Sequence, residues 1–435
     1  MRVLIIGSGG REHALAWALS QASPPVTLFC APGNPGISEF ATCLPCSPLD
    51  LEGLANIAEC HAVDLTLVGP EAPLAAGITD VFARRGLGIL GPTGAAAELE
   101  ASKVFMKTLC RQYGIPTAEF RVFDDPGDAA AHIRQAGRPL VVKADGLAGG
   151  KGVVVAATVD EGIGAVEAMM VERRFGGAGA RVVVEDVLEG DEVSVFALCD
   201  GTAVAPLLPV RDHKRLQDGD AGPNTGGMGA VAPVPSCGPE VVDRITNDVL
   251  EPVLWAMAQE GRPYRGVLFA GLMLTADGPR VLEFNVRWGD PEAQALLPLM
   301  DSSLLDALDA VLAGRVQSFA PRWRAASAAC VVLCADGYPT RPRTGAPISG
   351  IETVAGVEGV LVFHAGTALL EQRLVTAGGR VLNIVGVGRT LSEARARAYR
   401  AADVIEYPGK MFRRDIGARA LGKMRLAPAE SEVPV

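Results

Sequence analysis

The string RVLEFNVRWGDPE, residues 280–292, contains the most informative chemistry in the sequence. Side chains alternate between two faces of a strand, so Glu283 and Asn285 share a face and Arg287 follows on it. A carboxylate and an amide oxygen suit a hard cation of the Mg²⁺ type, which also takes water and phosphate oxygens. A guanidinium at Arg287 can clamp a phosphoryl group in transfer, and Asp290 can orient it or a substrate amine. The alternative is a half-buried strand with solvated charges.

A glycine-rich loop lies between two strand-like runs in VVKADGLAGGKGVVV. Its N–H groups can fold over phosphates, with nearby lysines as counter-charges. It is not a Walker A loop, because Gly152 stands where that motif needs a hydroxyl and no helix follows. A merely flexible hairpin is the alternative. The residues assigned to nucleotide phosphates are Lys103, Lys143, Gly146, Gly149, Gly150, Lys151 and Gly152.

Two further segments are interpreted as ligand-binding because such a loop is present. In RVVVEDVLEGDEVSV, a strand ends at Glu185 and the next begins near Glu192. The backbone near Val187 can read an adenine edge, while Glu192 accepts from ribose hydroxyls. The run DHKR at 212–215 and the glycine loop at 222–229 add cations and a segment able to close over a reactive intermediate.

The N-terminal GSGGREH resembles a dinucleotide fingerprint, but Glu12 occupies the place of its third glycine. The second strand ends in Cys30-Ala31-Pro32-Gly33 and lacks the acid that holds an NAD ribose, so an NAD-dependent dehydrogenase is disfavoured. A helix N-terminus beside glycines suits a phosphate-bearing small molecule better than a purely structural turn. The turns at 32–36 and 68–74 would face the same crevice, with Glu71 near a ligand hydroxyl or amine.

Composition excludes several classes of protein. The net charge of -10 disfavours nucleic acid, and no apolar run reaches the length of a membrane span. No secretory signal is legible at the N-terminus, so we expect a soluble cytoplasmic protein. The nine cysteines are scattered, and the Cys43/Cys46 pair is read as part of a loop rather than a zinc or redox site.

The 435 residues predict about three domains. Strand-like runs at 3–6, 26–30, 65–68 and 88–90 alternate with helical patterns, which indicates an open parallel α/β sheet over residues 1–102. An α+β core is expected over 103–320. A smaller α+β domain is expected over 325–426, followed by a frayed tail at 427–435.

Taken together, the motifs resemble those of the phosphoribosylamine-glycine ligase family, also called glycinamide ribonucleotide synthetases, of the ATP-grasp superfamily. The resemblance is collinear over nearly the whole chain, through GSGGREHALAWAL, APGNPG, VGPEAPL, KADGLAGGKGV, DHKR, GPNTGGMGA, EFNVRWGDPE, FHAGT, GGRVL and FRRDIG. It implies a preATP-grasp domain, an ATP-grasp core with a small mobile lid at about 120–190, and a C-terminal domain. It also implies ligation of glycine to 5-phosphoribosylamine with ATP and Mg²⁺ or Mn²⁺, by a cytoplasmic enzyme expected to be a monomer.

The resemblance implies a role for each motif residue. Glu185 and Val187 would hold adenine, Glu192 ribose, and Glu283 and Asn285 the metal. Catalytic roles fall to Arg287, Asp290, Asp212 and Lys214. The substrate-binding set is Gly9, Gly10, Arg11, Glu12, Asn34, Gly36, Glu71, Asn224, Gly226, Gly227 and Arg380.

The sequence departs from the family pattern at a few positions. Arg211 stands where Gln is expected, adding a charge beside the presumed glycine site; Gly149 replaces Ala and Trp288 replaces Phe. The strand at 271–275 offers no metal carboxylate, so the metal would depend on phosphate and water oxygens. Two alternatives remain: another ATP-grasp carboxylate-amine ligase, and a nucleotide-binding regulator without catalysis.

Overall fold

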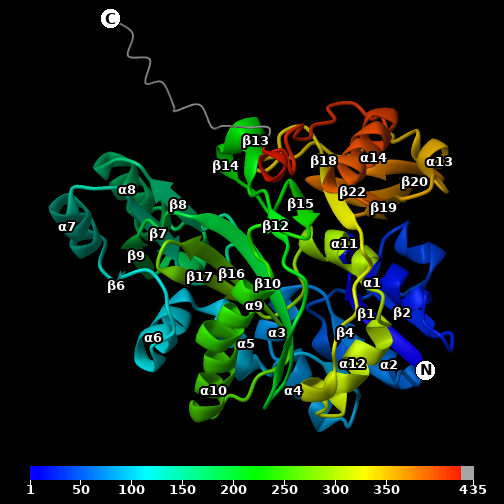
Figure 1. The fold of residues 1–435 in the computed structure, drawn as a ribbon, viewed down its shortest axis with the longest axis horizontal. Helices are drawn as coiled ribbons and strands as arrows, with labels where there is room; N and C mark the ends of the chain where they lie inside the picture. Colours follow the sequence, from blue (N-terminus) through cyan, green and yellow to red (C-terminus); the bar gives the residue numbers. More distant parts are fainter. Residues whose placement is uncertain (423–435) are drawn as a thin grey trace, which may run out of the picture.

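The computed structural model describes residues 1–422, so the tail expected at 427–435 and the end of the third predicted domain lie outside the described residues. The chain begins with a parallel sheet of strand order β3-β2-β1-β4-β5, drawn in blue in Figure 1. Its strands are β1 (Arg2–Gly7), β2 (Thr27–Pro32), β3 (Thr42–Cys43), β4 (Leu65–Val68) and β5 (Ile89–Leu90). The helices are α1 (Gly10–Ser20), α2 (Leu51–Cys60), α3 (Glu71–Ala75), α4 (Ile78–Arg84) and α5 (Gly94–Ala101). The predicted open parallel sheet is confirmed.

The strand order reverses between β1 and β4, which are hydrogen-bonded neighbours. In such sheets ligands bind outside the carboxyl ends of the strands at this switch point. The segments that leave β1 and β4 carry Arg11 and Glu71, so the fold brings these two side chains to one crevice.

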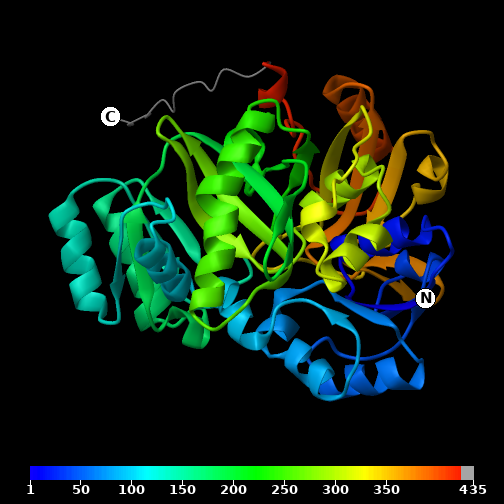
Figure 2. The ribbon, with the colours of Figure 1, turned by 60° about the horizontal axis from the view of Figure 1, so that its bottom comes forward.

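The lid unit, residues 120–186, is an antiparallel sheet of order β6-β9-β7-β8 covered by two helices. Its elements are β6 (Phe120–Phe123), α7 (Pro126–Ala136), β7 (Leu140–Ala144), β8 (Val153–Ala156), α8 (Val159–Val166) and β9 (Val182–Asp186). It projects to one side of the molecule in both views (Figures 1 and 2). Residues such as Ile133, Val142 and Met169 form a core of its own.

The central sheet has the order β11-β10-β16-β17 and is antiparallel. Its strands are β10 (Asp191–Asp200), β11 (Val204–Pro206), β16 (Arg265–Thr275) and β17 (Gly278–Asn285). The nearby helices are α6 (Lys103–Tyr113), α9 (Pro239–Ile245), α10 (Glu251–Gln259), α11 (Glu292–Leu296) and α12 (Leu304–Leu312). The strand that was predicted to carry Glu283 and Asn285 is confirmed as β17.

A third sheet, of order β12-β15-β18-β22-β19, joins the middle of the chain to its end. Its strands are β12 (Arg211–Asp212), β15 (Gly229–Ala232), β18 (Ser327–Cys334), β19 (Val360–His364) and β22 (Arg380–Gly388), with helices α13 (Ile351–Val354) and α14 (Leu391–Val404). The hairpins are β13 (Arg215–Gln217) with β14 (Ala221–Asn224), and β20 (Thr367–Leu370) with β21 (Arg373–Thr376). The DHKR segment therefore begins in the same sheet as Arg380.

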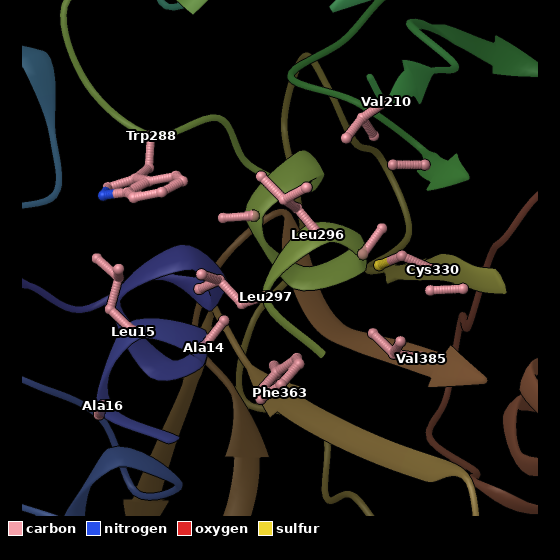
Figure 3. Close-up of a cluster of buried hydrophobic side chains, with 14 of the residues drawn as sticks. Ala14, Leu15, Ala16, Val210, Trp288, Leu296, Leu297, Cys330, Phe363 and Val385 are labelled. Carbon is pink, nitrogen blue, oxygen red and sulfur yellow. The ribbon is translucent and has the colours of Figure 1, made fainter. Parts of the chain in front are cut away.

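One apolar core spans the N-terminal and C-terminal units. Figure 3 shows Leu15 of α1, Leu296 and Leu297 after the GDPE turn, and Phe363 of β19 gathered in it. Trp288, at one edge, is 4% exposed. A shared core fixes α1, α11 and the third sheet relative to each other, whereas the lid unit is packed separately.

Candidate active site

One cavity of about 650 Å³ lies between the lid unit, the central sheet, the first sheet and the third sheet. Most of the site residues predicted from the sequence line it. They are Arg11, Glu71, Lys103, Lys143, Gly149, Gly150, Gly152, Glu185, Val187, Glu192, Asp212, Lys214, Asn224, Gly226, Glu283, Asn285, Arg287, Asp290 and Arg380. Eight predicted residues are not in the lining: Gly9, Gly10, Glu12, Asn34, Gly36, Gly146, Lys151 and Gly227.

Glu283 and Asn285 reach the cavity from the end of β17, as their spacing predicts. Burial would raise the pKa of Glu283, but the nearby cations, Lys214 first, lower it to about 2. Asn285 Oδ1 accepts a hydrogen bond from Arg287 at 3.2 Å. An ionised carboxylate and an amide oxygen, both open to the cavity, fit a hard divalent cation.

Arg287 is held by two acids from the first unit. Its Nε contacts Glu71 Oε2 at 3.1 Å, and an amino group contacts Glu100 Oε1 at 3.0 Å. Glu100 also accepts the N–H of Val286 at 2.7 Å, so it fixes both the backbone and the guanidinium at the end of β17. Burial raises the pKa of Glu100 to about 7, against the opposing effect of Arg287.

Glu185 lies between two lysines at the part of the cavity that borders the lid unit. Its carboxylate pairs with Lys143 and with Lys107, and Lys107 also donates to Thr117 Oγ1 at 2.6 Å. Lys143 donates to the Leu282 carbonyl at 2.9 Å, which ties the lid unit to the central sheet. Burial lowers the pKa of Lys107 to about 8. The acid at the strand end is thus buried and paired rather than exposed.

The glycine loop at 146–152 contacts the C-terminal unit, and β8, which follows the loop, contacts the second glycine loop. Gly149 and Gly150 have φ values of +57° and +75°, a region where a side chain is strained. Lys151 Nζ donates to the Pro339 carbonyl at 2.9 Å and is directed out of the cavity. Asn224 Nδ2 donates to the Val153 carbonyl at 3.3 Å.

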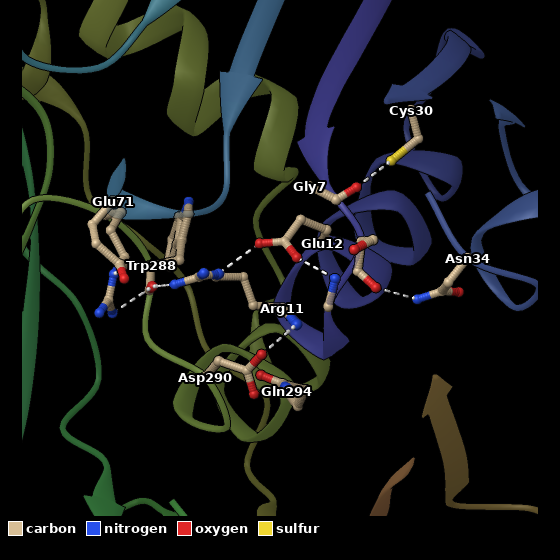
Figure 4. Close-up of polar contacts among 12 residues, drawn as sticks. Gly7, Arg11, Glu12, Cys30, Asn34, Glu71, Trp288, Asp290 and Gln294 are labelled. Atoms are coloured by element: carbon tan, nitrogen blue, oxygen red, sulfur yellow. Dashed lines mark hydrogen bonds and ion pairs between the residues drawn. The ribbon is translucent and has the colours of Figure 1, made fainter. Parts of the chain in front are cut away.

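The start of α1 is arranged around Arg11 and Glu12 (Figure 4). Glu12 caps the N–H of Gly9 and pairs with Arg11 Nε at 2.6 Å, so its carboxylate is used inside the fold. Arg11 also donates to the Trp288 carbonyl at 3.0 Å, and its N–H to Asp290 Oδ2 at 3.3 Å. Of this group, Arg11 and Asp290 face the cavity.

Glycines near α1 make room for side chains of the protein itself. A Cβ on Gly69 would lie 1.9 Å from Glu12 Oε1, and one on Gly10 would lie 2.2 Å from Asn383 Nδ2. Asn34 donates to the carbonyls of Ser8 and His364, and its Oδ1 accepts from Ile37. The structure therefore gives these positions a packing role.

Lys214 lies near Glu192 and Glu283. Its Nζ is 2.6 Å from Glu192 Oε1 and 3.6 Å from Glu283 Oε1. Arg211, the extra charge noted in the sequence, pairs with Asp191 at 3.3 Å and donates to the Glu192 carbonyl. Its charge is compensated before any substrate enters.

Arg380 and Tyr338 hold the second glycine loop from the C-terminal unit. Arg380 donates to the carbonyls of Gly226 and Asp290 and lies 3.4 Å from Asp290 Oδ1. The Tyr338 hydroxyl accepts the N–H of Gly226 at 2.9 Å. Burial would raise the pKa of Asp290, but Arg380 and Arg11 lower it.

Family models match all three parts of the chain: the N domain of phosphoribosylglycinamide synthetase over residues 1–100, its ATP-grasp (A) domain over 101–293 and its C domain over 328–419. The chain belongs to the phosphoribosylglycinamide synthetase family. The phosphoribosylamine-glycine ligases of Brucella melitensis biotype 1 and Mesorhizobium japonicum are each 48% identical to it, over 97% and 98% of this chain and 98% and 100% of theirs. A crystal structure of phosphoribosylamine-glycine ligase from Thermotoga maritima superposes with a TM-score of 0.82 at 36% identity, covering 96% of this chain and all of that one.

As a phosphoribosylglycinamide synthetase, the chain is an ATP-dependent ligase whose ATP-grasp domain binds ATP with a divalent metal. Within residues 1–422, no helix combines the length and the apolar run that crossing a bilayer requires. No group of three or more His, Cys, Asp or Glu side chains that could hold a metal occurs in the same part of the chain.

Several cavity residues of this synthetase were missed by the sequence analysis. Glu100 lies 185 residues from Asn285, and nothing in its helical surroundings indicates a buried acid. Glu292 was noted only as the last residue of the GDPE string, although its place in that string indicates that it belongs to the site. Arg413, whose side chain is 1% exposed, pairs with Asp220 and Asp415 and secures the hairpin after DHKR.

Proposed function

We propose that this protein joins glycine to 5-phosphoribosylamine in an ATP-dependent reaction of purine biosynthesis. The products are glycinamide ribonucleotide, ADP and phosphate. The observation that supports this most is the single cavity lined by the lid glycines, by the Glu283 and Asn285 oxygens, and at its other end by Arg11 and Arg380. One enclosed site can therefore accept a nucleotide, a small acid and a phosphorylated amine together.

The chemistry requires two steps, because a carboxylate is a poor electrophile. A glycine carboxylate oxygen first attacks the γ-phosphorus of ATP, breaking its bond to the bridging oxygen and releasing ADP. The phosphoribosylamine nitrogen then attacks the carbonyl carbon of glycyl phosphate, losing a proton as phosphate leaves. No covalent enzyme intermediate is needed.

The residues act by position and charge. Lys103, Lys143 and Arg287 face the region where negative charge converges during phosphoryl transfer. Glu283 and Asn285 would hold Mg²⁺, or Mn²⁺, which when bound neutralises phosphate charge. Gly149 and Gly150 cover the phosphates and exclude water that would hydrolyse the acyl phosphate.

At the other end, Arg11 and Arg380 are placed to hold the ribose phosphate, with Glu71 near a ribose hydroxyl. Glu185 and Val187 would contact adenine and Glu192 its ribose. The protein would work as a cytoplasmic monomer without nucleic acid as a ligand.

The test is ADP release by the purified protein with ATP and Mg²⁺, with glycine and with phosphoribosylamine generated from ribose 5-phosphate and ammonia. We expect ADP release that requires both substrates, and a product with the mass of glycinamide ribonucleotide. ADP release that depends on neither, or ATP binding without release, would overturn the substrate assignment.

A further inference from the structure

Two acids in the cavity stand apart from all the others. Every other carboxylate that lines it belongs to an ion pair: Glu71, Glu100, Glu185, Asp186, Glu192, Asp220, Glu283, Asp290 and Asp415. Asp212 and Glu292 line the same cavity, and within residues 1–422 neither forms an ion pair. The site thus contains two acids that lack a direct ion-pair partner in the described protein, although the charges of Lys214 and Arg287 act on them from further away.

Their burial makes this arrangement costly. Glu292 is only 3% exposed, yet no hydrogen bond from another described residue reaches its carboxylate. Asp212 Oδ1 is buried without a hydrogen-bond partner. A buried carboxylate normally finds a donor, and an orphaned one is expected to have a ligand as its partner.

The second glycine loop brings Asp212 next to the turn that carries Glu292, and the charge of Glu292 acts on Asp212. A Cβ on Gly227 would lie 3.0 Å from Asp212 Oδ1 and 2.4 Å from Pro291, the residue before Glu292. Burial and the charge of Glu292 both raise the pKa of Asp212. A cation placed between them would relieve both the repulsion and the missing hydrogen bonds.

Resting on the function proposed above, we propose that Asp212 and Glu292 form the binding site for the α-ammonium group of glycine. The geometry orients the amino acid, because Lys214 lies two residues after Asp212 and 3.6 Å from Glu283. The glycine carboxylate would then point toward Lys214 and the transferring phosphate, and the ammonium away from it. The acids are specificity-determining residues for a charged amine beside the reacting carboxylate.

The amine of phosphoribosylamine suits this place less well. It must attack as a neutral nitrogen, and a pair of unbalanced carboxylates favours the protonated, unreactive form. The glycine amine keeps its proton throughout the reaction, so holding it as ammonium costs no reactivity.

The experiment compares glycine with glycolate, which has a hydroxyl in place of the ammonium. We expect Glu292→Gln to lower kcat/KM for glycine on the order of 10- to 100-fold, mainly through KM, with glycolate changed by less than about threefold. KM for ATP and for phosphoribosylamine should stay within about twofold. Because Glu292 has no ion pair to lose, the variant is expected to melt no lower than the parent protein.

A matched control is Glu358→Gln, an exposed acid of the C-terminal unit, which should leave the glycine-to-glycolate ratio unchanged. Asp212→Asn is the second variant and should lower the same ratio. An unchanged ratio in both folded variants, or a rise in KM for phosphoribosylamine instead of glycine, would overturn this assignment. If the parent protein itself releases no glycine-dependent ADP, the proposed function is what fails.

Discussion

The substitution Glu100→Gln tests how the protein holds Arg287. Glu100 is 8% exposed, and burial raises the pKa of its carboxyl from 4.5 to about 7. The folded state therefore binds this proton more tightly than the unfolded chain does. The stability that Glu100 contributes is fully present below pH 4.5 and is lost as the pH rises through 7.

The size of the effect follows from the two pKa values. Between pH 5 and pH 8, titration of Glu100 alone lowers the free energy of unfolding by roughly 2 to 3 kcal/mol. A glutamine cannot titrate, so the Glu100→Gln variant should lose this part of the pH dependence. Turnover should fall on the order of 10-fold, because the amide holds the Arg287 guanidinium less firmly than a carboxylate.

The assay is equilibrium unfolding in urea at pH 5 and pH 8, followed by tryptophan fluorescence, without ligands. Glu98→Gln is the control, since Glu98 lies on the same helix α5 but pairs with Arg262 at the surface. It should keep the parent's pH dependence. Parallel stability curves for the parent and Glu100→Gln from pH 5 to pH 8 would refute the reasoning about Glu100.

Three more changes have expected outcomes. Asn285→Ala should lower turnover on the order of 100-fold, measured as ADP release, while the melting temperature stays near the parent's; near-normal turnover would remove it from its role. Gly69→Ala should destabilise the protein by about 2 kcal/mol or more, because its Cβ would collide with Glu12, whereas Gly164→Ala on α8, with open space around it, should be neutral or slightly stabilising in urea unfolding. Burial lowers the pKa of His13 to about 3, so the neutral imidazole contributes stability that is fully present above pH 6.5 and is lost as the pH falls toward 3. The His13→Asn variant should therefore lose less free energy of unfolding than the parent between pH 6.5 and pH 4 in urea unfolding. An equal loss in the variant and the parent would contradict this.

Much of the fold was predictable because local patterns and the tertiary structure agree. The alternation of strands and helices over the first hundred residues predicted the parallel sheet, and period-two spacing placed Glu283 and Asn285 on the cavity side of β17. These predictions depend on residues close together in the chain, where geometry leaves few choices.

The partners of charged residues were not predictable in the same way. Glu185 was expected to hold adenine and it does line the cavity, but its ion pairs with Lys107 and Lys143 were not predicted. Glu12 was assigned to substrate, yet it caps α1 in a space that Gly69 leaves free. Which acid pairs with which base depends on distances across the fold, which the spacing within a motif does not contain.

The lid unit and the rest of the cavity wall also differ in how they are packed. The lid unit has its own core, whereas the first sheet, α11 and the third sheet share one. The loop at 146–152 reaches the C-terminal unit through the hydrogen bond from Lys151 to Pro339, and β8 accepts another from Asn224 at Val153. Each is worth only about 1 kcal/mol. The strands of the unit are held by further contacts, namely the Glu185–Lys107 ion pair and the hydrogen bond from Lys143 to Leu282. The acids Asp212 and Glu292 lie on β12 of the third sheet and on α11, outside the lid unit. The proposed ammonium site is therefore built without any residue of the lid unit.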